Sequence, residues 1–296
     1  MTVLVAAALG AAPAQAQLKV VTSTTDLYDI AKAVGGTRIT ATHIGEGYQD
    51  PHFIEAKPSF VLQLRNADVW AFVGLDLELG WMSLLLDGAR NPRLNPGGSG
   101  YLDVSRAIAV IDVPTGNLDR SQGDVHPLGN PHYWLDPENG RRMAKLFLAK
   151  FTELDPKGAA VYDANEKAFE EKLGATEKGW AADLASIRGK PVVAWHTSWH
   201  YFGQYTGMKI VAYMEPKPGV PPSPSHLLSV VAAIKASGAK VIIMEPFYDK
   251  KMSDLVARQT GATVLVLPPS VGGVPGTPDY FMLLQKDVSM LAAALR

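Results

Sequence analysis

The sequence predicts an α/β fold with two lobes, each a mainly parallel sheet flanked by helices, joined by one long rigid helix. Strand-like and helix-like segments alternate near both ends of the chain, a pattern typical of parallel sheets covered by helices. A proline-free amphipathic stretch separates the two series. The chain has 296 residues, 47% of them hydrophobic, which is enough for one large core or two moderate cores.

The first series begins with a β-branched run, LKVVTST, followed by Leu27, Ile30 and Ala33 at helical spacing and closed by two glycines. This pattern predicts a strand that leads into a helix. The segments ITATHIG and ADVWAFVG predict two further buried strands, and PSFVLQLRNA predicts a helix between them. AIAVIDV, residues 107–113, predicts a fourth strand.

The connecting stretch begins at Asp155-Pro156 and continues to about Ile187. Its apolar residues recur at intervals of three, four and seven, which predicts one helix of about 30 residues and ~45 Å. We therefore expect a lobe at residues 17–154, the linking helix at 155–188 and a second lobe at 189–296.

The second series follows the linking helix. KPVVAW, KVIIM and TVLVLP predict strands, whereas SPSHLLSVVAAIKASG, DKKMSDLVARQTG and the segment from Asp279 onward predict helices. Gly238 and Gly261 stand where helix C-caps are expected.

Residues 1–16 end in Ala14-Gln15-Ala16 after an apolar run, which is typical of a secretory signal peptide, although a basic start is missing. A buried N-terminal helix is the alternative. We expect a periplasmic protein that begins near Gln17. The formal net charge of −1, with no block of Lys and Arg, argues against a nucleic-acid partner. Cysteine is absent, so histidines and carboxylates are the available metal ligands.

Three of the seven histidines occupy positions that suit a metal ligand. His52 and His132 each follow a proline in a loop, and the restricted backbone there limits the movement of the side chain. His196 directly follows a predicted strand, at the end where open α/β sheets bind ligands. Imidazoles held in this way predict a shared metal site.

Four segments, VVTSTTDLYDIAKAVGG, DPHFIEAKPS, NPHYWLDP and HTSWHYF, together resemble the zinc/manganese class of substrate-binding proteins of ABC importers (cluster A-I), in the same order along the chain. The resemblance implies two lobes with a metal in the cleft between them, a monomer that is not an enzyme, and a membrane permease with its ATPase as partner. Carried over residue by residue, the ligands fall on His52, His132 and His196.

The fourth ligand departs from that family pattern. Many members carry an aspartate after the last strand, where this chain has LVLPPSVGG. Glu245, at the end of a predicted strand, is the tentative fourth ligand, and a hydrogen-bonding role beneath the site is its alternative. Glu215, His200 or a water molecule are the other candidates.

Other polar residues have expected supporting roles. His126, with Asp119 and Asp124, lies where zinc-type members often insert a histidine-rich loop, and metal capture there is a hypothesis. Asp50 and Asp136 are expected to accept hydrogen bonds from ligand imidazoles. The two remaining histidines are expected to be ordinary surface or capping residues: His43 and His226.

Three imidazoles with at most one carboxylate favour Zn²⁺ as the transported ligand, because Mn²⁺ prefers more oxygen ligands. The predicted function is capture of Zn²⁺ for an ABC importer. Import of Mn²⁺ or another divalent metal by the same fold, a metal-dependent adhesin or periplasmic chaperone, and a mononuclear zinc hydrolase are the alternatives.

Overall fold

The computed structural model describes residues 17–115, 123 and 125–296. The predicted signal peptide, residues 1–16, and the predicted loop residues Asp119 and Asp124 lie outside this part. None of the helices within the described ranges combines the length and apolar character that a membrane crossing requires.

The N-terminal lobe contains a four-stranded parallel sheet in the order β2-β1-β3-β4. Its β-branched and aromatic segments form the strands, and the helices follow where apolar residues recur at helical spacing. The strands are β1 (Leu18–Thr22), β2 (Ile39–His43), β3 (Val69–Phe72) and β4 (Tyr101–Asp103), and the helices are α1 (Thr25–Gly35), α2 (Pro58–Arg65) and α3 (Met82–Ala89).

The C-terminal lobe repeats the arrangement with a parallel sheet in the order β6-β5-β7-β8. Gly238 and Gly261 cap helices in the left-handed conformation, as predicted. The strands are β5 (Pro191–Ala194), β6 (Lys209–Tyr213), β7 (Val241–Met244) and β8 (Thr263–Val266), and the helices are α7 (His200–Thr206), α8 (Pro224–Ser237), α9 (Lys251–Thr260) and α10 (Tyr280–Leu295).

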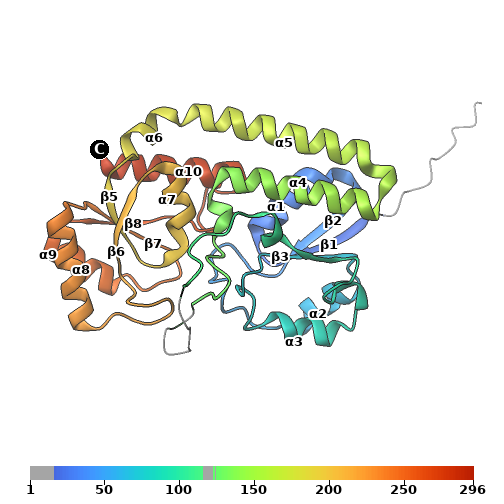
Figure 1. Ribbon diagram of the computed structural model, residues 1–296, viewed down its shortest axis with the longest axis horizontal. Coiled ribbons are helices and arrows are strands. Elements are labelled where there is room, and N and C mark those ends of the chain that lie inside the picture. The colour runs from blue at the N-terminus through green and yellow to red at the C-terminus, as the bar shows by residue number, and fades with distance from the viewer. Residues whose placement is uncertain (1–16, 116–122, 124) are drawn as a thin grey trace, which may run out of the picture.

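A layer of long helices connects the two lobes along one side of the molecule (Figure 1). The layer consists of α4 (Pro137–Leu154), α5 (Ala159–Gly179), α6 (Ala181–Ile187) and α10, and α5 packs against α4 while α6 packs against α10. The predicted long connecting helix is therefore present, but it is divided at Trp180. The backbone there leaves helical geometry, with φ −103° and ψ 10°, and the completely buried side chain donates its indole N–H to the Tyr205 hydroxyl at 2.9 Å.

The buried apolar residues confirm the two-lobe α/β prediction and add a connection between the lobes. One cluster contains residues of both sheets, such as Val20 and Ile243, together with the inner faces of α4, α5 and α10. Two smaller clusters lie on the other faces of the sheets. The boundaries at 154 and 188 stay a prediction, since one core crosses both.

The strand predicted at 107–113 is wrong. Asp112 has a left-handed φ of 55°, which a strand does not accommodate. Instead, the carbonyl of Ile111 accepts a hydrogen bond from Asn130 N–H at 2.9 Å, and the N–H of Ile111 donates to the Tyr201 hydroxyl oxygen at 3.2 Å. The fourth strand of this sheet is β4, a three-residue segment at the end of the sheet.

Candidate metal centre

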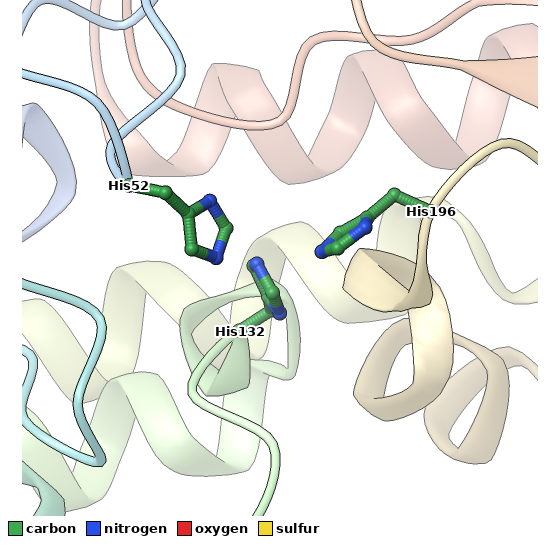
Figure 2. A group of neighbouring side chains, drawn as sticks. All are labelled: His52, His132 and His196. Atoms are coloured by element: carbon green, nitrogen blue, oxygen red, sulfur yellow. The ribbon is translucent and has the colours of Figure 1, made fainter. Parts of the chain in front are cut away.

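His52, His132 and His196 come from three separate segments, and their rings turn toward one point (Figure 2). One ring nitrogen of each lies within 4.8 Å of the chosen nitrogen of each other ring. Their ring centroids are 5.2–5.5 Å apart. A tetrahedral zinc ion with bonds of ~2.05 Å holds its ligand nitrogens about 3.3 Å apart, so these rings need to close in by ~1.5 Å at most.

The two Pro-His segments orient their rings by the same device. The Oδ1 atom of Asp50 accepts the backbone N–H of His52 at 3.0 Å and lies 2.7 Å from its ring Nδ1. In the same way, the Oδ1 atom of Asn130 accepts the backbone N–H of His132 at 3.0 Å and lies 2.9 Å from its ring Nδ1. The residue two positions before each histidine thus engages Nδ1 and leaves Nε2 for a metal.

His196 follows β5 and is oriented from a different part of the chain. Its Nδ1 lies 2.8 Å from Oε2 of Glu215, which follows β6, the neighbouring strand. Glu215 also accepts the indole N–H of Trp195 at 3.2 Å. The Nε2 atom of His196 is buried and has no hydrogen-bond partner. Buried polar atoms are rarely left without a partner, and a bound metal ion would supply one.

Burial favours the neutral imidazole of His132, the form that metal ligation requires. Burial lowers the pKa of His132 well below its usual value, and the neighbouring His196 and His52 lower it further. For Asp50, burial alone would raise the pKa of the carboxyl, but its contacts with His52 outweigh burial and lower it. Asp50 is thus held as an anion beside the His52 ring.

Glu245, the tentative fourth ligand, is not part of the group of converging ligand atoms. It follows β7 and is completely buried, and neither carboxyl oxygen has a hydrogen-bond partner. Burial raises the pKa of Glu245 to about 8, and the nearby Ser198 hydroxyl offsets this only in part. Glu245 is therefore a buried acid outside the converging group, and its hydrogen-bonding role beneath the site stays a prediction.

His200 also lies outside the group. Its ring bonds to the carboxylate of Asp112 on one side and to the Tyr213 hydroxyl on the other, so both nitrogens are engaged. Glu215, another candidate for the fourth position, serves instead as the partner of His196.

The prediction for Asp50 is confirmed, whereas the prediction for Asp136 is wrong. Asp136 caps α4 by accepting the backbone N–H of Glu138 at 2.8 Å, because it directly precedes the helix. Asn130 takes the place expected for Asp136 and was missed. The signal was present in the sequence, since Asp50 and Asn130 stand at the same offset before a Pro-His pair.

A family model described as the periplasmic zinc-uptake complex component A, ZnuA, matches residues 20–294. The chain belongs to this family. A high-affinity zinc uptake system protein ZnuA of Brucella abortus is 32% identical over 158 residues, 53% of this chain and 47% of the relative. The chain thus matches about half the length of that relative.

Other family relatives cover more of the chain. The iron ABC transporter substrate-binding lipoprotein MtsA of Streptococcus pyogenes is 28% identical over 280 residues, 90% of this chain and 86% of MtsA. A crystal structure of ZnuA superposes with a TM-score of 0.76 at 21% identity, over 95% of this chain and all of that one. A cadmium-bound periplasmic metal-binding protein from Candidatus Liberibacter asiaticus gives 0.79 at 22% identity, with the same coverage. These structures share the two-lobed fold.

Proposed function

We propose that this chain is the extracytoplasmic metal-binding component of an ABC importer, and that it captures Zn²⁺ through His52, His132 and His196. The observation that carries the proposal is the convergence of three imidazoles with each Nδ1 already engaged by an oxygen acceptor. The unpartnered, buried Nε2 of His196 supports the same conclusion, because a cation supplies the partner that this lone pair lacks.

The donor set favours zinc among the divalent metals. Neutral imidazoles suit Zn²⁺, whereas Mn²⁺ prefers carboxylate and water oxygens. The carboxylates of Asp50 and Glu215 face the outer Nδ1 atoms of their histidines, where they raise ligand basicity. Since relatives are named for zinc and for iron, and a structural neighbour was solved with manganese, metal preference is the quantity to measure.

The partner and compartment follow from the same proposal. A periplasmic binding protein receives Zn²⁺ outside the cytoplasm and delivers it, as a monomer, to a membrane permease with its ATPase. Family membership supports this assignment, and the apolar segment at residues 1–16 supports export. In this role the metal is cargo, so the site binds it without turning over a substrate.

Competitive chelator titration tests the binding site directly. We expect one Zn²⁺ per chain and weaker binding of Mn²⁺. His132→Ala should lower zinc affinity at least tenfold, because it removes one of three convergent donors. His226→Ala is the matched control, since that imidazole bonds to the Tyr213 carbonyl away from the site. Unchanged affinity in His132→Ala would refute the assignment.

Growth under zinc limitation tests the importer role. Deletion of the gene should impair growth in chelator-treated medium, and the normal gene should restore it whereas a His52/His132/His196 triple alanine variant should not. Zinc-dependent turnover of ester, peptide or phosphoester substrates by the purified protein would instead favour the hydrolase.

A further inference from the structure

A fourth imidazole, that of His126, lies beside the metal centre. Its Nε2 atom is 3.1 Å from Nε2 of His52, and the two rings stack with centroids 5.2 Å apart. His126 belongs to the segment that precedes Asn130 and His132, and the ring is partly buried. Its position next to a predicted ligand calls for a physical explanation, since two ring nitrogens rarely approach this closely without a proton or cation between them.

The surroundings of the two rings leave their Nε2 atoms facing each other. Nδ1 of His52 lies 2.7 Å from the Asp50 carboxylate, and the His126 ring bonds to the backbone of Leu75. One cation bound to both rings accounts for the 3.1 Å between the two Nε2 atoms.

We propose that His126 is the fourth ligand of the captured Zn²⁺. The 3.1 Å between the two Nε2 atoms is close to the ~3.3 Å between nitrogens on one tetrahedral zinc ion. The centroid of His126 is 6.1 Å from that of His132, compared with 5.2 Å between His132 and His196, a difference of 0.9 Å. His126 lies outside the group whose ligand atoms are all within 4.8 Å of one another, so its ring moves toward His132 and His196 when it joins the coordination sphere.

The segment that carries His126 contacts both lobes. On the N-terminal side, the backbone of Leu75 accepts a hydrogen bond from the His126 ring. Leu75 lies in a turn in which it and Asp76 have left-handed φ values of 54° and 66°, which are unusual for residues with side chains. On the C-terminal side, Gly123 approaches Pro218 so closely that a Cβ atom would lie 2.2 Å from its carbonyl oxygen.

The segment around Pro218 also contacts the predicted ligand His196, through Glu215. The Glu215 carboxylate lies beside Nδ1 of His196 and accepts the backbone N–H of Gly219, the residue after Pro218, at 3.3 Å. The position of the His126 segment is therefore linked to the loop that orients another ligand. An open cavity lined by His52, His126, Asp76 and Trp81 gives an incoming ion access from solvent.

A site with four imidazoles has a specific consequence for metal choice. Four neutral nitrogen donors complete a tetrahedron without an oxygen ligand, which suits Zn²⁺ and disfavours Mn²⁺. His126 would thus determine specificity as well as affinity. Its loss leaves three imidazoles and a position for water, a set that discriminates less against oxygen-preferring metals.

X-ray absorption at the zinc edge, on full-length protein loaded with zinc ion alone, tests the ligand count. We expect four imidazole nitrogens at about 2.0 Å in the normal protein, and three plus one oxygen in His126→Ala. Zinc affinity should fall about 10- to 100-fold in that variant, and the preference for Zn²⁺ over Mn²⁺ should narrow. His43→Ala, whose ring bonds to the Gly45 carbonyl, is the control.

The role of His126 rests on the zinc capture proposed above, and the variants separate the two. Suppose that His132→Ala loses zinc affinity while His126→Ala has the same zinc affinity and the same three imidazole ligands as the normal protein. In that case only the fourth-ligand assignment is overturned. If His132→Ala has normal affinity, the proposed function itself fails. His126→Gln, which retains the size of the side chain, gives the same measurement should the alanine variant not fold.

Discussion

Asp26 provides the most demanding test of the electrostatics in this fold. It lies in the first turn of α1 and is completely buried. Its Oδ1 accepts the backbone N–H of Val271 at 2.9 Å, which ties the first helix to the loop after β8, and its Oδ2 has no partner. Burial raises the pKa of this carboxyl from 3.8 to about 7, despite the hydrogen bonds that favour its charged form.

The magnitude follows from the two pKa values. In the unfolded chain the group ionises near 3.8, and in the folded chain near 7, a gap of roughly 3 pH units. At 1.36 kcal/mol per unit this amounts to about 4 kcal/mol, an upper figure for one group. The unfolded state releases the proton first. Stability from Asp26 is therefore complete below about pH 3.8 and declines as pH rises through about 7.

Asp26→Asn removes that decline, and urea unfolding between pH 4.5 and 8 measures it. The difference in unfolding free energy, variant minus normal, should increase by ~1.4 kcal/mol per pH unit up to about 7 and then level off. A constant offset of about 1–3 kcal/mol from the unpaired amide N–H groups does not affect this slope. Asp287 is also buried, and burial raises its pKa well above the usual value.

Asp163→Asn is the control, because that carboxylate is half exposed on α5 and its loss should leave the pH profile unchanged. A flat difference for Asp26→Asn between pH 4.5 and 7 would contradict the raised pKa. A difference that falls as pH rises would mean that Asp26 is ionised in the folded protein.

Three further substitutions test packing and orientation. Tyr280→Phe removes a buried hydroxyl that donates to a main-chain carbonyl at 2.5 Å, and should lower the unfolding free energy by about 1–2 kcal/mol in urea titrations. Glu215→Gln removes the charge that faces His196 and should weaken zinc binding about tenfold, with exposed Glu171→Gln unchanged. Gly47→Ala would place a Cβ atom 2.0 Å from a main-chain oxygen, so thermal unfolding should occur at a markedly lower temperature; an unchanged midpoint would refute the close approach.

The sequence predicted the parts of the fold that depend on neighbours along the chain. Alternating strand and helix patterns gave the α/β class, and Gly238 and Gly261 gave two helix ends, because each signal lies within a few residues of its effect. Short or irregular segments were harder. β4 has three residues, and the apolar run at 107–113 has the composition of a strand but no partner strand to pair with among the described residues.

For the candidate metal centre, the sequence by itself determined which imidazoles stand on constrained backbone, because His52 and His132 each follow a proline. Only the tertiary structure decided what surrounds them. Glu215 reaches His196 across two neighbouring strands, and His126 meets His52 from 74 positions away. Such contacts depend on the order of strands in the sheet and on how two lobes close on one another. Strand order and lobe packing depend on how apolar surface is buried over the whole core, and a short stretch of sequence does not specify that.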